Sequence, residues 1–192
     1  MTKTALKPWN TAMRRKGPSA PLGAILKWIK PPMRVLDFGC GRGADVAHLR
    51  KLGVEAEGYD SHAEFGCPMP DGLFDAVVSI YVLNVIPTPK ERKNAVRLAL
   101  SKVRPGGKLI LVSRTPKEIS REAAAKGWQP HGDGFLSDEK RGTFQKGLGT
   151  KELAGLMGRV GQHAFTIAGG EFSMVVSRTP SEIAAEVPDR PR

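Results

Sequence analysis

The sequence has few cysteines, few histidines and no long apolar run. Its two cysteines and four histidines show neither the spacing of a disulfide framework nor that of a metal site. No stretch approaches the roughly 20 apolar residues of a membrane span, and the first residues lack the apolar core of a secretory signal. We therefore expect no bound metal and no membrane association, and a cytoplasmic, reduced protein is the simplest interpretation.

Acidic residues are absent before Asp37, whereas Lys and Arg recur throughout that segment. The whole chain carries a formal net charge of +11 and has a pI of about 10.0. Such a balance favours a polyanionic partner such as nucleic acid, because cationic side chains that neutralise phosphates release counterions. The alternative is an arm that only improves solubility. Residues 1–30 are expected to form this basic arm, ending in a short packed helix over 21–29.

The length of 192 residues predicts one domain, and a stretch of glycines organises it. Residues 33–46 read MRVLDFGCGRGADV: a short apolar strand, Asp37, three glycines and the start of a helix. A glycine turn of this kind lets a ligand approach the backbone in front of a helix N-terminus. Dinucleotide folds use the turn for a pyrophosphate, which the carboxylate of Asp37 would repel. That carboxylate suits the ammonium and sulfonium of S-adenosylmethionine, although a structural turn without a ligand is the alternative.

A second predicted strand, residues 54–60, reads VEAEGYD and ends in an acid. Asp60 lies 17 positions after Gly43, close to where nucleoside-binding α/β domains place the acceptor of the ribose hydroxyls. The alternative is a solvated acid at a strand end. We expect Asp60 to bind the ribose.

The motifs DFGCGRG, GYD, LFDAVVSIYVLNVIP and VRPGGKLILVSR resemble, in order, those of the class I S-adenosylmethionine-dependent methyltransferases. The resemblance covers residues 33–114 and implies an enzyme of the EC 2.1.1 class. It also implies an α/β fold with a Rossmann-like, doubly wound sheet and the cofactor S-adenosyl-L-methionine. The residues that it assigns to the cofactor are Asp37, Phe38, Gly39, Cys40, Gly41, Gly43, Asp45, Tyr59, Asp60, Ser61, Ser79, Ile80 and Tyr81.

A narrower resemblance links SAP near the start, GCGRGADV, YVLNVIP and RGTFQ to small methyltransferases beside phage, plasmid and DNA-phosphorothioation genes. It implies no established acceptor. Together with the basic arm, this resemblance predicts which residues would contact an acceptor. These are Arg14, Arg15, Ser19, Arg114, Arg141, Thr143, Phe144 and Gln145.

The main departure from the family lies between Asp60 and Phe74. Class I methyltransferases usually place a helix, a third strand and another helix there, and the end of that strand holds the adenine. The intervening residues are barely enough for one crossover. We expect a sheet that lacks the usual third strand, with this loop closing the adenine pocket or leaving it open.

The next strand, residues 74–83, should be central and buried at 76–78. Amino-methylating DNA enzymes carry an Asn-Pro-Pro-Tyr type motif after this strand, and the chain has Ser79-Ile80-Tyr81 instead. This difference counts against a standard adenine-N6 or cytosine-N4 mechanism. Tyr81 and Asn84 remain candidates to line the methyl-transfer site, or they are packed residues at the strand end.

Three Thr-Pro-x-Glu segments, starting at Thr88, Thr115 and Thr179, predict capped helix starts. Thr150 is a further predicted cap, for a helix over 151–159. Residues 164–167 and 172–177 predict a closing antiparallel hairpin. We divide the chain into the arm (1–30), a methyltransferase domain (31–178) and a short tail (179–192).

Residues 127–149 show no clear periodicity and predict a long glycine-rich loop. Aromatic side chains between basic and amide ones suit stacking on a flipped or single-stranded base, whereas a plain surface insertion is the alternative. His131 and Asp133 are candidate general bases if the acceptor must lose a proton. Three functions stay open: a methyltransferase acting on nucleic acid, which we favour; one acting on a small molecule or protein; and an inactive cofactor-binding accessory protein.

Overall fold

The structure, a computed structural model, describes residues 5–158, 165–169 and 172–179. Its centre is a six-stranded sheet in the order β2-β1-β3-β4-β9-β8. The first four strands are parallel, and β9 and β8 join them antiparallel, which confirms the predicted fold class with its C-terminal hairpin. The strands are β1 Arg34–Phe38, β2 Glu55–Tyr59, β3 Phe74–Ile80, β4 Val103–Arg114, β8 Phe165–Gly169 and β9 Phe172–Arg178.

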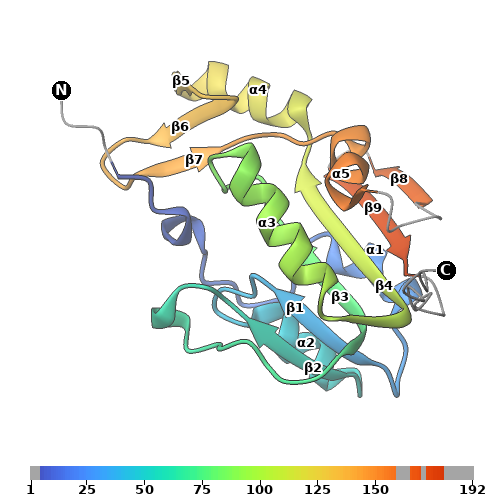
Figure 1. The fold of residues 1–192 in the computed structure, drawn as a ribbon. Coiled ribbons are helices and arrows are strands. Elements are labelled where there is room, and N and C mark those ends of the chain that lie inside the picture. Colours follow the sequence, from blue (N-terminus) through green and yellow to red (C-terminus); the bar gives the residue numbers. More distant parts are fainter. Residues whose placement is uncertain (1–4, 159–164, 170–171, 180–192) are drawn as a thin grey trace, which may run out of the picture.

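Both faces of the sheet are buried because apolar side chains occupy successive positions of each central strand. Val35 belongs to one core cluster and its neighbour Leu36 to the other, and Ile110 and Leu111 divide in the same way. Helices cover the two faces (Figure 1). The first face packs against α1 Leu22–Ile25 and α2 Ala44–Lys51, and the second against α3 Pro89–Leu100 and α5 Thr150–Met157.

The predicted loss of a strand is confirmed. β2 is the edge of the sheet, and only the single 3₁₀ turn η3 Ala63–Phe65 lies between it and β3. The loop is tied back to the sheet end, since Asp60 N donates to Cys67 O at 2.9 Å. The carboxyl ends of β1, β2 and β3 meet beside an edge that carries no further strand from the described residues.

The prediction of a structureless loop over 127–149 is wrong. This stretch forms a second, three-stranded antiparallel sheet in the order β5-β6-β7. Its strands have three to five residues, and positive-φ glycines (Gly132 and Gly142) punctuate the turns, so the period of a strand never becomes visible. The strands are β5 Gln129–His131, β6 Gly134–Asp138 and β7 Thr143–Gln145, preceded by α4 Pro116–Lys126.

The helix caps are partly as predicted. Thr88 forms a full capping box with Glu91, and Thr115 accepts a hydrogen bond from Glu118 N at 3.1 Å. The Thr150 cap is wrong: the N-cap residue of α5 is Gly149, whose backbone is extended, and Thr150 already lies inside the helix. The third predicted cap involves residues 180–182, which lie outside the described residues, as does the hairpin turn at 170–171.

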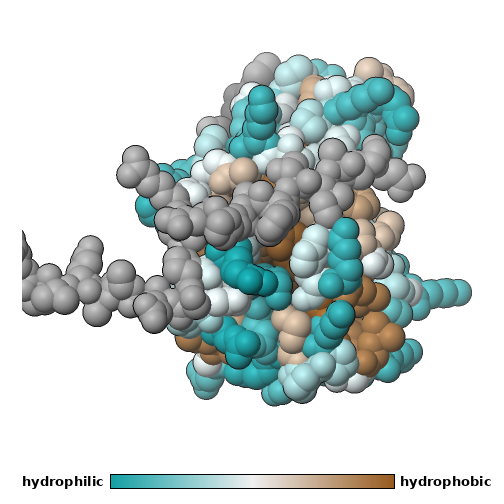
Figure 2. Space-filling view, turned by 90° about the vertical axis from the view of Figure 1, so that its right-hand side faces the viewer, coloured by the Kyte–Doolittle hydropathy of each residue, from teal (hydrophilic) through white to brown (hydrophobic). Residues whose placement is uncertain are grey.

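Figure 2 views the molecule from the side on which β8 and β9 close the sheet. Hydrophilic residues predominate on the upper part of this face, and hydrophobic residues gather at its lower right. No helix in the described ranges is both long and apolar enough to cross a membrane. Those ranges also contain no group of three or more His, Cys, Asp or Glu side chains arranged to hold a metal ion.

Candidate functional site

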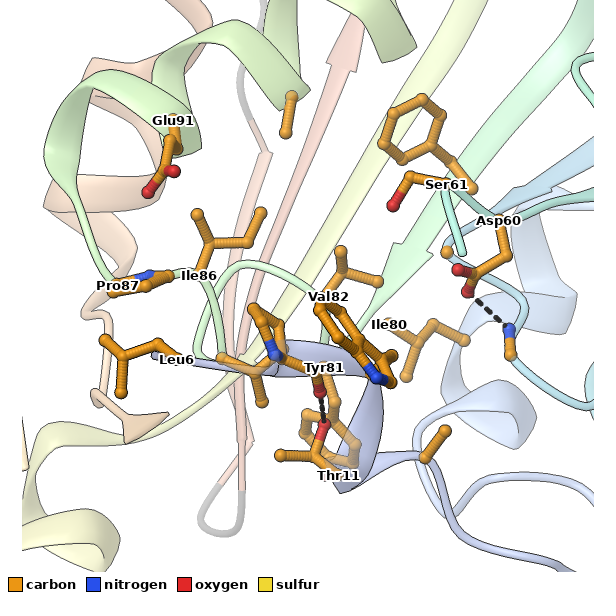
Figure 3. A pocket seen from close by; sticks show the side chains of 18 of the residues that line it. Leu6, Thr11, Asp60, Ser61, Ile80, Tyr81, Val82, Ile86, Pro87 and Glu91 are labelled. Carbon is orange, nitrogen blue, oxygen red and sulfur yellow. Dashed lines mark hydrogen bonds between the residues drawn. The ribbon is translucent and has the colours of Figure 1, made fainter. Parts of the chain in front are cut away.

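A cavity of about 1140 Å³ lies where β1, β2 and β3 end. Ligands of open α/β sheets bind at this carboxyl edge, where loops rather than strands form the walls. Figure 3 shows two ends to the cavity. Asp60 and Ser61 lie at one end, Ile86, Pro87 and Glu91 lie at the other, and Tyr81 and Val82 lie between them.

The glycine turn forms the floor of the first end. Gly39, Gly41 and Gly43 all adopt positive φ, at 84°, 52° and 74°. A Cβ at Gly39 would lie 2.3 Å from Val82 Cγ2, so only glycine fits where the turn passes below that side chain. Gly39 N and Cys40 N both donate to Tyr59 O, at 2.7 and 3.0 Å, which joins the turn to the end of β2.

Asp60 is the acid that β2 presents to the cavity. Its Oδ2 accepts a hydrogen bond from Gly41 N at 2.9 Å (Figure 3), and its Oδ1 accepts one from His62 N at 3.0 Å. These two bonds fix the carboxylate beside the glycine turn. A carboxylate oxygen accepts more than one hydrogen bond, so Asp60 retains capacity for a pair of ribose hydroxyls.

Asp37, at the end of β1, is 3% exposed and does not line the cavity. Burial raises the pKa of Asp37 from 3.8 to about 8, and the neighbouring carboxylate of Asp45 raises it further, while Arg15 lowers it. A carboxyl with this pKa is largely protonated at neutral pH. A cation bound nearby favours its ionised form, so Asp37 fits the vicinity of a positively charged ligand.

This pKa predicts a pH-dependent stability that Asp37→Asn removes. Between about pH 4 and pH 8 the folded chain retains a proton that the unfolded chain has released, so Asp37 lowers stability as pH rises through this range. The free energy of unfolding of Asp37→Asn is expected to exceed that of the wild type by a margin that grows with pH. The margin should increase by up to about 1.4 kcal/mol per pH unit and level off above about pH 8. Urea unfolding from pH 5 to 9 measures it, and parallel pH profiles for the two proteins would contradict the assignment.

The N-terminal arm is attached to α2 through Asp45. Asp45 is 2% exposed, and it accepts Ser19 N at 2.6 Å and Arg15 Nη2 at 3.2 Å. Arg15 itself lines the cavity. The arm thus lies over the glycine turn rather than extending into solvent.

The arm also binds the small sheet. The 3₁₀ turn η1 Pro8–Thr11 lies beside the turn between β6 and β7 (Figure 1). Lys7 N donates to Gly142 O at 2.7 Å, Asn10 Nδ2 donates to Arg141 O at 2.7 Å, and the Arg141 guanidinium donates to Asn10 O. These bonds join two segments more than 130 residues apart, and other residues of both segments, such as Trp9 and His131, line the cavity.

Tyr81, directly after β3, has φ +59°, the only positive φ at a non-glycine residue in the described part of the chain. Such a conformation costs on the order of 1–2 kcal/mol and persists where the surroundings enforce it, often at a functional site. The Tyr81 N–H donates to Val112 O at 2.9 Å. The strained backbone places Tyr81 in the cavity between its two ends (Figure 3).

The second end of the cavity is mainly apolar. Figure 3 shows Leu6, Ile86 and Pro87 close together there. Leu98 of α3, which is 42% exposed, adds an apolar side chain to the cavity lining. The described charged side chains in this part of the lining are those of Glu91 and Asp133. The described lining residues outside the glycine turn and the end of β2 include Leu6, Pro8, Val85, Ile86, Pro87, Thr88, Pro89, Glu91, Asn94, Ala95, Leu98, His131, Gly132 and Asp133.

Most of the predicted cofactor residues meet at the cavity, and a few do not. Asp37, Asp45 and Ser79 are buried behind it, and Gly43 is the N-cap of α2 just outside it. Those in the lining are Phe38, Gly39, Cys40, Gly41, Tyr59, Asp60, Ser61, Ile80 and Tyr81.

The candidate bases His131 and Asp133 line the cavity, but Asn84 does not. Asn84 is 1% exposed, and its Nδ2 donates to Gln145 Oε1 at 3.0 Å. Asp133 forms ion pairs with Arg92 and with Lys146. The side chain of Asn84 therefore joins two elements of the fold instead of facing the cavity.

The predicted acceptor residues are dispersed. Thr143 and Phe144 are 5% and 1% exposed, so their side chains are not presented to a ligand, and Ser19 is buried as well. Arg114 pairs with Glu118 and Glu122 outside the cavity lining, and Arg14 is exposed outside it. Of this set, only Arg15 lines the cavity.

Several residues in or next to the cavity were not predicted from the sequence. Trp9 stacks on His62, with ring centroids 4.4 Å apart, and Phe65 lies next to His62 at 5.6 Å. Their aromatic character was the only signal, and it did not show that residues 9 and 62 meet. Arg92 is 1% exposed, but its helix contains several other charged residues, and nothing in the sequence distinguishes Arg92 from them.

Taken together, the residues fit S-adenosylmethionine. The turn at Gly39 leaves no space for a side chain, Asp60 stands at the end of β2, and a buried acid lies behind them. The cavity exceeds the roughly 300–1,000 Å³ of a single small-molecule site, so it has room for the cofactor and a small second ligand.

Comparison with known proteins agrees with this geometry. Residues 11–146 match a family described as "Methyltransferase domain". A solved S-adenosylmethionine-dependent methyltransferase from Methanosarcina mazei superposes with a TM-score of 0.63 at 18% identity, covering 86% of this chain and all of that one. A 1,6-didemethyltoxoflavin-N1-methyltransferase from Burkholderia thailandensis, solved with its substrate and S-adenosylhomocysteine, gives 0.57 at 20% identity, covering 84% and 77%.

Among curated proteins, a ribosomal protein L11 methyltransferase from Cupriavidus taiwanensis is 30% identical over 126 residues. The match covers 55% of this chain and 42% of the relative. The chain thus spans less than half the length of that relative.

Proposed function

Because this chain belongs to the methyltransferase domain family and uses S-adenosylmethionine as cofactor, we propose that it methylates a small, largely apolar acceptor. The supporting observation is the composition of the second cavity end. Among the residues that the structure describes, its lining contains no Lys or Arg, carries the carboxylates of Glu91 and Asp133, and is otherwise mostly apolar. Apolar walls with a few polar groups are typical of sites for small organic molecules, and the carboxylate of Glu91 would repel a phosphodiester.

In this proposal, the first cavity end holds the cofactor. The glycine turn, Asp60 and Ser61 bind it, Asp37 is buried behind the turn, and Asp45 holds the arm through Ser19 and Arg15. Residues 31–178 act as the methyltransferase domain, and residues 1–30 act as an arm that covers it. S-adenosylmethionine supplies an electrophilic methyl group on a sulfonium.

The chain itself contributes mainly proximity and alignment. Tyr81 and Val82 lie between the two ends of the cavity, so they are placed to line the path of the methyl group (Figure 3). An acceptor that retains a proton at its nucleophilic atom requires a base. His131 is the better placed of the two candidates, because the carboxylate of Asp133 is already paired with Arg92 and Lys146.

Methyl transfer is best tested with labelled S-adenosylmethionine and separate fractions of small metabolites, protein, DNA and RNA. Label is expected in the small-molecule fraction, and extraction into an organic solvent would show its apolar character. Label only in protein, DNA or RNA would overturn the proposed acceptor class. Label in none of them, with measurable cofactor binding, would favour the inactive accessory protein.

Once the acceptor is known, Leu98→Asp is expected to lower kcat/KM about 10-fold through a higher KM, because it places a charge on an apolar part of the cavity wall. The Kd for S-adenosylhomocysteine should not change. Leu52→Asp is the matched control, since Leu52 is 45% exposed but lies outside the cavity. Equal effects of the two substitutions would argue against an acceptor site at Leu98.

Nucleic acid is the second candidate acceptor, and the net charge of +11 supports it. The exposed Arg14 of the arm lies outside the cavity, so a nucleic acid would bind the surface and deliver one base to the site. The DNA and RNA fractions of the labelling experiment test this candidate directly.

A further inference from the structure

The edge of the sheet leaves one part of the cofactor without an obvious binding surface. In the part of the chain that the structure describes, β2 is the last strand on this side, and η3 is the only regular element between Asp60 and β3. A ribose bound at Asp60 would direct its base away from the glycine turn, toward this edge. The residues at this edge must then form the surface that contacts the base, since no further strand of the described residues is there to form it.

Three aromatic rings occupy this position. Trp9 of η1 stacks on His62, with a centroid distance of 4.4 Å and an interplanar angle of 22°. Phe65 of η3 lies 5.6 Å from His62, and the Arg42 guanidinium lies 5.6 Å from the Phe65 ring. Trp9 and Phe65 both line the cavity, as Asp60 and Ser61 do.

The rings are positioned by hydrogen bonds that do not involve a ligand. The loop of His62 and Phe65 is held at Asp60, which binds both His62 N and Cys67 O. The arm carrying Trp9 is held on one side by the turn at Gly142 and on the other by Asp45. Such a surface is preorganised, so binding a flat ring costs little ordering of side chains.

We propose that Trp9 and Phe65 form the surface that binds the adenine of S-adenosylmethionine, so that the N-terminal arm replaces the missing strand and is part of the cofactor site. His62 supports the indole from behind. An indole that is 38% exposed at a cavity wall is a typical stacking platform for a base. The inference rests on the cofactor site and is independent of the acceptor.

One consequence is that arm docking and cofactor binding are coupled. A ligand that contacts Trp9 stabilises the docked arm, and by reciprocity an arm that cannot dock lowers the affinity for the ligand. The coupling works through the contacts of Lys7 and Asn10 with the small sheet.

The test is calorimetric binding of S-adenosylhomocysteine and of adenosine to Trp9→Ala and Phe65→Ala. Each substitution is expected to weaken both ligands about 10-fold or more, since stacking of a base on an aromatic side chain contributes about 1–3 kcal/mol. Trp9→Phe should recover most of the affinity. Trp128→Ala is the matched control, because Trp128 is partly exposed and lies outside the cavity.

A second measurement does not require the loss of Trp9. In the variant Trp28→Phe/Trp128→Phe, Trp9 is the only tryptophan, and its fluorescence is expected to change on saturation with S-adenosylhomocysteine. Unchanged fluorescence at saturation, or wild-type affinity in a folded Trp9→Ala protein, would overturn the proposal. These readouts do not depend on the acceptor, so a failed acceptor assay and a failed adenine surface are distinguishable.

Discussion

Replacing Asp60 with alanine is expected to weaken binding of S-adenosylhomocysteine about 100-fold while the chain remains folded. Hydrogen bonds to a charged group contribute about 1.5–3 kcal/mol each, and the substitution removes the acceptor of the ribose hydroxyls. It also releases Gly41 N and His62 N, so both the glycine turn and the Trp9–His62 stack lose their shared support. Isothermal titration calorimetry measures the affinity, and thermal unfolding shows that the variant is folded.

Two variants make this result specific to the carboxylate. Asp60→Asn keeps one acceptor oxygen, so its affinity for S-adenosylhomocysteine should lie between those of the wild type and Asp60→Ala. Glu64→Ala removes an exposed acid of the same loop and should bind as wild type does. Wild-type affinity in a folded Asp60→Ala protein would show that the cofactor does not use the end of β2.

The part of this site that was predictable from the sequence is the part built from local signals. Asp37, the glycines and Asp60 lie at the ends of two short strands that are close together in the chain. Because parallel strands end at one edge of a sheet, these residues had to meet. The missing strand was predictable for a similar reason, since the few residues between Asp60 and Phe74 exclude another crossover.

The rest depends on contacts between distant segments. The small sheet pairs strands of three to five residues, and its turn binds an arm more than 130 residues earlier in the chain. Nothing in either segment alone shows this pairing. The burial of Thr143 and Phe144 follows from the same sheet, which explains why residues interpreted as an acceptor surface became interior ones. The sequence shows that residue 144 is aromatic, but it does not show whether that side chain points to the interior or to solvent.

Arg92 is the clearest case of a side chain whose role only the fold reveals. It is 1% exposed on α3, donates to Ile86 O at 2.7 Å and forms an ion pair with Asp133, which is 36% exposed on the turn between β5 and β6. Ile86 and Asp133 both line the second end of the cavity. Arg92 therefore joins the two walls that the proposed acceptor would touch.

The two partners of this pair are expected to respond unequally to substitution. Asp133→Ala leaves a buried guanidinium without its counterion and should lower the free energy of unfolding by about 2–3 kcal/mol, somewhat less than for a fully buried pair. Arg92→Met should cost less, because the exposed carboxylate of Asp133 still contacts Lys146 and water. The double variant should be more stable than Asp133→Ala alone, since it removes the unpaired charge.

Urea unfolding of the four proteins measures this cycle, and Lys126→Ala serves as the control. Lys126 pairs with Glu122 on the exposed face of α4, where such pairs contribute less than about 1 kcal/mol. If Asp133 were instead a general base, Asp133→Ala would reduce kcat with little change in stability, and the double variant would not recover. If Asp133→Ala lowers stability and the added Arg92→Met restores part of it, the role of Asp133 is to stabilise the cavity wall at the proposed acceptor site. His131 is then the remaining candidate base in the cavity.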